Sequence, residues 1–158
     1  MARELFTTWG DYQAGIDRLL AMAGAEILIW DPDLGNLRLG GGSRLDALKR
    51  LLAGPTQPCL RIAVHDPDFF LRKEPRLVDL LRTYHHTMAV HRCSDQLAGL
   101  RDTMLLVDGK HGLIRFDREQ PRSKLLVDET EELLPYLNRF EEIWSEGGTP
   151  VSATTLGL

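Results

Sequence analysis

The stretch LRDTMLLVDGKHGLIRF, Leu100–Phe116, decides how the rest of the chain is interpreted. Two apolar runs lie on either side of Asp108-Gly109-Lys110. An Asp-Gly pair between such runs is typical of a tight β-turn, because both residues tolerate the positive backbone angles that the turn requires. We therefore predict two antiparallel strands joined as a hairpin, with the carboxylate of Asp108 at the turn.

Upstream of the hairpin, helical patterns alternate with short apolar runs. Thr8 and Ser43 are suitable N-caps, and Pro75 suits the first turn of a helix. The apolar runs are continuous rather than alternating, as is common in parallel strands that are buried on both faces. Helices are expected over about 9–23, 43–54 and 75–85, and strands over 25–30, 59–65 and 87–93.

Downstream of the hairpin, a polar loop leads into one last helix, which begins at Asp128 or Thr130. Its inner stripe is expected to consist of Leu133, Leu137, Phe140 and Trp144, with Leu134 and Ile143 beside it. The element order α-β-α-β-α-β-β-β-α predicts an α/β fold with a mixed, partly parallel sheet and helices on both faces. We expect a single domain over residues 1–146 and a flexible C-terminal tail over residues 147–158.

The composition narrows the class of protein. The chain has 158 residues, 43% of them hydrophobic, and a formal net charge of −4. That charge argues against a protein whose whole surface binds nucleic acid, although a local basic patch stays open. The sequence has no membrane-length apolar run and no signal-peptide core, so a cytoplasmic location without membrane attachment is expected. Cys59 and Cys93 are interpreted as reduced thiols that serve in packing.

The element order and the hairpin Asp resemble one half of the phospholipase D superfamily, over about residues 11–144. That family carries the motif HxKxxxxD, usually followed by Gly-Ser and Asn. Its His is the nucleophile on phosphorus, its Lys holds phosphate oxygens, and its Asp supports the fold and the site. Counting back from Asp108 places the family's Lys at Thr103 and its His at Arg101, so only the Asp matches. Gly112-Leu113 matches the Gly-Ser element weakly.

The two substitutions imply a degenerate site in an uncharacterised bacterial-type domain. A guanidinium stays protonated, so Arg101 cannot act as a nucleophile or a base, and no catalytic residue is expected. An arginine can still bind a phosphate in bidentate fashion. The resemblance therefore implies a binding or interaction module, and the candidate residues for a phosphate-bearing ligand are Arg101, Thr103, Asp108 and Arg115. The alternative is an ordinary hairpin in which Arg101 pairs with a neighbour.

The resemblance also bears on partners. Active members of the superfamily build one site from two such halves, so a lone half implies a homodimer or a second domain. A third hypothesis keeps the dimer without the ligand and makes the chain a purely structural dimerisation domain.

An acidic rim offers a different enzyme class. WDPD (30–33) and HDPD (65–68) each follow a predicted parallel strand, where ligands of open α/β sheets bind. ILIWDPDLG also resembles the first motif of haloacid-dehalogenase-like phosphatases, which implies a nucleophile at Asp31, an acid/base at Asp33 and a Mg²⁺ ion. Two observations argue against this resemblance. A helix precedes the strand here, and Asp-Pro-Asp is also common in ordinary turns. We otherwise expect no cofactor.

Other candidate sites are weaker. The five histidines show no i, i+4 pair, although His91 and Cys93 share a strand face. The Gly-rich segment before Ser43 and Arg44 could hold an anion at a helix N-terminus. Three basic residues in the loop after the hairpin could join Arg101 and Arg115 in a local cationic patch: Arg118, Arg122 and Lys124.

Overall fold

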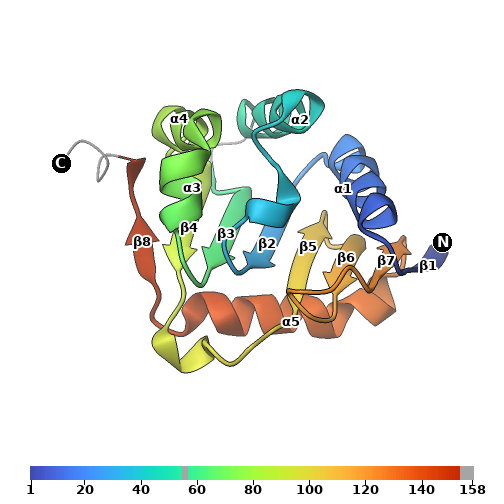
Figure 1. Ribbon diagram of the computed structural model, residues 1–158. Helices are drawn as coiled ribbons and strands as arrows, with labels where there is room; N and C mark the ends of the chain where they lie inside the picture. The colour runs from blue at the N-terminus through green and yellow to red at the C-terminus, as the bar shows by residue number, and fades with distance from the viewer. Residues whose placement is uncertain (55–56, 154–158) are drawn as a thin grey trace.

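The computed structural model describes residues 1–54 and 57–153, which form one mixed sheet with helices on both faces (Figure 1). Within these residues the sheet has eight strands, ordered β1-β7-β6-β5-β2-β3-β4-β8. The β2–β3 and β3–β4 pairs are parallel and the other neighbouring pairs are antiparallel. The strands are β1 (Ala2–Phe6), β2 (Ile27–Asp31), β3 (Leu60–Val64), β4 (Met88–Arg92), β5 (Thr103–Val107), β6 (His111–Arg115), β7 (Ser123–Val127) and β8 (Thr149–Val151).

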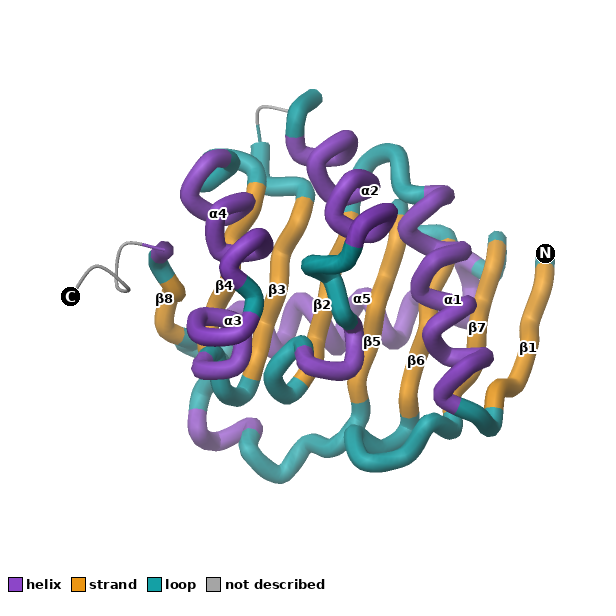
Figure 2. Tube along the Cα trace, turned by 45° about the horizontal axis from the view of Figure 1, so that its top comes forward, coloured by secondary structure: helices purple, strands orange, loops and turns teal. Residues whose placement is uncertain are grey.

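The helices divide unequally between the two faces of the sheet. Four lie over one face: α1 (Trp9–Met22), α2 (Gly42–Leu52), α3 (Asp68–Lys73) and α4 (Pro75–Thr83). The long helix α5 (Thr130–Ser145) crosses behind the opposite face, as Figure 2 shows. This arrangement is the mixed α/β fold that the sequence predicts. No helix among the described residues is long and apolar enough to cross a membrane.

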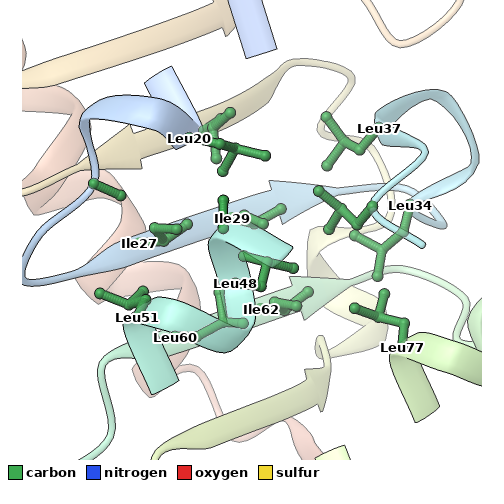
Figure 3. Close-up of a cluster of buried hydrophobic side chains, with 14 of the residues drawn as sticks. Leu20, Ile27, Ile29, Leu34, Leu37, Leu48, Leu51, Leu60, Ile62 and Leu77 are labelled. Atoms are coloured by element: carbon green, nitrogen blue, oxygen red, sulfur yellow. The ribbon is translucent and has the colours of Figure 1, made fainter. Parts of the chain in front are cut away.

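Each face of the sheet has its own hydrophobic core. The larger core lies beneath the four-helix face, and the smaller core lies beneath α5. All five residues of β2 are buried, because this central strand has a core on each side. Figure 3 shows leucine and isoleucine side chains of the larger core, drawn from three helices and two central strands: Leu20, Leu48, Leu51, Leu77, Ile27, Ile29, Leu60 and Ile62.

The predicted hairpin is confirmed. Strands β5 and β6 pair in antiparallel register, with Thr103 opposite Arg115 and Val107 opposite His111. The N–H of Lys110 donates to the carbonyl of Val107 at 3.1 Å. The two residues between them, Asp108 and Gly109, have φ values of 56° and 66°. The Asp-Gly pair therefore forms the primed type of turn, whose twist suits a hairpin.

Several expected details are wrong. The structure has three elements where none is expected, namely β1, β7 and α3. The sequence of β1 carries no buried pattern because the strand is mostly exposed, and β7 directly follows a polar loop. Helix α2 begins at Gly42 with Gly41 as its cap, so Ser43 is not the N-cap. Leu134 is 54% exposed rather than part of the inner face of α5.

The segment expected as a C-terminal tail contains a short strand. Residues 149–151 form strand β8, which pairs with β4 and ends the sheet on that side. Residues 154–158 lie outside the described residues. The division of the chain at residue 146 stays a prediction.

Candidate functional site

A cavity of about 360 Å³ lies at the carboxyl ends of the central strands β2 and β3. The carboxyl ends of parallel strands are the usual place for ligands in open α/β sheets. Loops that follow β2, β3 and β6 supply the lining residues, which are Pro32, Asp33, Asn36, His65, Asp66, Arg118 and Glu119. The predicted acidic rim supplies three of them: Asp33, His65 and Asp66.

Arg115, at the end of β6, is fully buried beside these strand ends. Its guanidinium donates to Oδ1 of Asp31 at 3.3 Å, to the carbonyl of Asp117 at 3.3 Å and to the carbonyl of Arg118. The guanidinium also lies over the rings of Trp9 and Tyr12, at 5.3 and 5.1 Å from their centroids. A charge this deep needs such partners, because burial without them is very costly.

Asp31, the last residue of β2, is the buried counterion and is 1% exposed. Its Oδ2 accepts the backbone N–H groups of Asp33 at 3.3 Å and Leu34 at 2.7 Å. Burial raises the pKa of Asp31 from 3.8 to about 6, and the nearby Arg115 opposes that rise. The Asp31 carboxylate therefore has buried partners on both oxygens.

The Asp31–Arg115 pair holds two of the three loops that line the cavity. The carboxylate of Asp31 fixes the start of the loop after β2, and the guanidinium of Arg115 fixes carbonyls in the loop after β6. Leu34 has a φ of 72°, a left-handed conformation that is strained for a branched side chain. Its N–H bond to Asp31 and its buried side chain hold it there.

We predict that the Asp31 carboxyl titrates near pH 6 in the folded chain. Since its pKa is raised on folding, the folded state binds more protons between pH 3.8 and about 6, and this group makes stability fall as pH rises through that window. Carboxyl ¹³C NMR of labelled aspartate, with Asp31→Asn to assign the signal, measures the midpoint. A midpoint below pH 4 would contradict the prediction.

Two further buried hydroxyl groups adjoin Arg115 in the sheet. Thr103 and Ser123 are the cross-strand neighbours of Arg115 on β5 and β7. Burial, and then the charge of Asp31, raise the pKa of Tyr12, whose hydroxyl also interacts with Arg115 and Thr103. Within the described residues, Nε of Arg115 and Oγ of Ser123 have no hydrogen-bond partner. Tyr12 and Ser123 were not expected here, because nothing in the local sequence distinguishes them.

Arg101 does not join this buried group. Its side chain is exposed, and its Nε donates to Oδ1 of Asp117 at 2.6 Å. A second ion pair joins its NH2 to Glu119 at 3.1 Å. These partners, Asp117 first, raise the pKa of Arg101 further, so it is a permanent cation. Arg101 therefore pairs with neighbours across the loop, although not with the adjacent Asp102, which binds Arg139.

Asp108 lies at the hairpin turn, on the side of the sheet opposite the carboxyl ends of β2 and β3. Its carboxylate accepts three backbone N–H groups, from Gly24 at 3.0 Å, Ala25 at 2.8 Å and Glu26 at 2.9 Å. Burial raises the pKa of Asp108, and these bonds outweigh that effect, so the net pKa lies below 3.8. Of the four predicted ligand residues, the structure thus brings together only Thr103 and Arg115.

His65 is the imidazole at the cavity. Its Nδ1 lies 3.7 Å from Sγ of Cys93, and its ring packs on Trp30 with centroids 4.5 Å apart. Burial and then Arg118 lower the pKa of His65, so the ring is neutral at pH 7. His91 lies elsewhere, stacked on Trp144 beneath α5. In this structure Cys93 is the neighbour of His65, and His91 packs on Trp144 instead.

The metal hypothesis finds its two aspartates in different settings. Asp31 is buried and paired with Arg115, whereas Asp33 lines the open cavity. Among the residues with described positions, no group of three or more His, Cys, Asp or Glu side chains could hold a metal ion. The magnesium alternative stays a prediction. It is tested by phosphatase activity that requires Mg²⁺ and disappears in Asp31→Asn.

Solved structures with this fold include phospholipase D family members. Nuc from Salmonella typhimurium matches with a TM-score of 0.63 and 10% identity, over 96% of this chain and 98% of that chain. NucT from Helicobacter pylori matches with a TM-score of 0.60 and 12% identity, over 95% and 99%. At these identities the likeness establishes the fold, which is phospholipase D-like.

A longer protein shares the fold as well. TrmBL2, an archaeal chromatin protein described as showing a novel mode of DNA binding, matches with a TM-score of 0.68 and 12% identity. The match covers 96% of this chain but 54% of that one, so this chain spans about half its length. No curated protein matches the chain in sequence. One family model, described as "Domain of unknown function (DUF7931)", matches residues 10–153.

Proposed function

The chain belongs to the family described as Domain of unknown function (DUF7931), and we propose that it is a noncatalytic binding module built on the phospholipase D-like fold. The observation that carries this proposal is the position of Arg115. A fully buried guanidinium, paired with Asp31, lies between Thr103 and Ser123 on the three neighbouring strands. A permanent cation held in this way can position loops, but it cannot attack phosphorus or accept a proton.

The surroundings of Arg115 support the same proposal. The two positions that correspond to the superfamily's His and Lys hold Arg101, which is engaged by Asp117 and Glu119, and Thr103, which is 2% exposed. The imidazole at the cavity, His65, lies in the loop after β3 rather than on the hairpin, and its Nδ1 faces Cys93. None of these groups offers a free nucleophile on the hairpin.

The cavity supplies the binding half of the proposal. Its volume of about 360 Å³ is within the range of small-molecule sites. The ligand would therefore contact the loops after β2, β3 and β6, rather than Arg101 and Asp108, which lie outside this cavity. Within this proposal a phosphate-bearing ligand would bind through Arg118, because no other described lining residue carries a guanidinium.

The test of the noncatalytic role is a phosphoester hydrolysis assay. We expect no turnover of bis(p-nitrophenyl) phosphate or p-nitrophenyl phosphate, with Mg²⁺ or with EDTA, beyond that of heat-denatured chain. Turnover in EDTA would contradict the proposal. The variant His65→Ala would then test whether the imidazole at the cavity is responsible. Turnover that requires Mg²⁺ and disappears in Asp31→Asn would favour the acidic-rim phosphatase instead.

A second copy or a second domain is also part of the proposal. Its support is the resemblance to halves that pair in the superfamily, together with exposed apolar side chains next to the candidate site. Trp9 is 38% exposed and Phe116 is 42% exposed. Light scattering on the full chain measures the mass directly. A mass of one chain at all concentrations would contradict the homodimer and would not bear on the binding role.

A further inference from the structure

The charges around the cavity are mixed in a way that specifies a ligand. Three lining residues carry carboxylates, namely Asp33, Asp66 and Glu119, and one lining residue carries a guanidinium. The remaining titratable lining group, His65, is neutral at pH 7 because burial and Arg118 lower its pKa. An anion alone would face an excess of negative charge, and a cation alone would leave the Arg118 guanidinium without a hydrogen-bond acceptor.

Arg118 is the seat for an anionic group. Its backbone is fixed, because its carbonyl accepts from Arg115 and its N–H donates to the carbonyl of Arg101 at 2.7 Å. Within the part of the chain that the structure describes, its guanidinium donates no hydrogen bond and forms no ion pair, and its charge acts only at longer range, on Asp117 and His65. A guanidinium held at a cavity wall with its donors free is suited to a carboxylate or a phosphate group.

Asp33 and Asp66 form the seat for a cationic group. Oδ1 of Asp33 accepts the N–H of Gly35 at 2.9 Å, and Oδ1 of Asp66 accepts the N–H of Asp68 at 2.9 Å. These bonds orient both carboxylates. In the described residues they leave the second oxygen of each without a hydrogen bond, so both can accept from an ammonium group. The third carboxylate, Glu119, is partly neutralised by Arg101.

We infer that the cavity binds a small zwitterion, a molecule with a protonated amine and an anionic group a few bonds apart. The amine lies against Asp33 and Asp66, and the anionic group lies against Arg118. The inference rests on the proposed binding function and names its class of ligand. The buried Asp31–Arg115 pair anchors the loop that carries Asp33 and the loop that carries Arg118, so it holds these two side chains on fixed loops of the cavity.

The test is isothermal titration calorimetry on the full chain at pH 7 with five probes. Two are zwitterions, γ-aminobutyrate and 2-aminoethylphosphonate, and three carry charge of one sign: butylamine, butyrate and inorganic phosphate. We expect each zwitterion to bind at least tenfold more tightly than any of the other three. The zwitterion that binds more tightly shows whether the cavity prefers a carboxylate or a phosphonate as the anionic group.

Three variants locate the binding. Arg118→Gln and Asp66→Asn should each weaken zwitterion binding at least tenfold, because each removes one charge from the wall while keeping polar atoms. Arg122→Gln is the matched control, since Arg122 is an exposed arginine of the same loop that does not line the cavity; it should change binding less than twofold. Melting curves confirm that all three variants fold.

Several results would overturn the inference. They are equal binding of phosphate or butyrate, equal binding of butylamine, undiminished binding by Arg118→Gln, and no binding of either zwitterion. A failure here is distinguishable from a failure of the proposed function. Phosphoester turnover would overturn the noncatalytic role, whereas an inactive chain that binds neither zwitterion overturns only the ligand class.

Discussion

Replacement of Arg115 by Met is expected to lower the free energy of unfolding by about 3–5 kcal/mol at pH 8, because it leaves a buried carboxylate without its counterion. Methionine retains much of the apolar stem, so most of the loss comes from the charge and its bonds. The lost interactions are those with Asp31 and with the carbonyls of residues 117 and 118. Urea denaturation followed by circular dichroism measures the change.

Two comparisons sharpen this result. Arg122→Met removes an exposed arginine of the neighbouring loop and should change stability by less than about 0.5 kcal/mol. The double variant Asp31→Asn/Arg115→Met should be more stable than Arg115→Met alone, because it removes the unpaired charge and keeps an acceptor for the N–H groups of residues 33 and 34. A cost below about 1 kcal/mol for the single variant would show that the pair is not important for stability.

Replacement of Asp108 by Ala is expected to lower the free energy of unfolding by about 2–4 kcal/mol, since its carboxylate accepts three backbone N–H groups of the segment between α1 and β2. Hydrogen bonds to a charged acceptor contribute about 1.5–3 kcal/mol each. Water can reach part of this site, which reduces the sum. Asp108→Asn is the matched control, because Asn tolerates the φ of 56° and keeps one acceptor oxygen.

The same bonds give Asp108 a pH dependence of known sign. Its folded pKa is lowered below 3.8, so its contribution is complete above that value and is lost as pH falls through the folded pKa. Wild type should therefore lose more stability than Asp108→Asn on acidification below pH 4. Parallel acid titrations in urea measure the difference. If the two curves fall together, the carboxylate is not the group responsible.

The two predictions separate two structural roles in and beside the hairpin. Arg115 acts at the strand ends that carry the cavity, whereas Asp108 acts at the opposite strand ends, where it joins the hairpin turn to the segment between α1 and β2. We expect Asp108→Ala to lower stability without changing the cavity. Arg115→Met is expected to disturb both, because the guanidinium holds a cavity loop.

The sequence by itself determined the elements whose patterns are local. The Asp108-Gly109 turn, the buried runs of the parallel strands and the stripe of Leu133 and Phe140 on α5 each follow from residues a few positions apart. The edge strands β1 and β8 escaped prediction, since β1 is mostly exposed and β8 has only three residues. Their strand conformation depends on pairing with β7 and β4, which are distant in sequence.

Only the tertiary structure decided which charged residues are buried together. In the sequence, Arg101 and Arg115 are equivalent arginines on either side of a hairpin, yet one is exposed beside Asp117 and the other is fully buried against Asp31. The difference arises because Arg115 lies in the sheet beneath Trp9 and Tyr12 of α1, about 100 residues earlier in the chain. Burial depends on what packs over a residue, and local sequence does not contain that information.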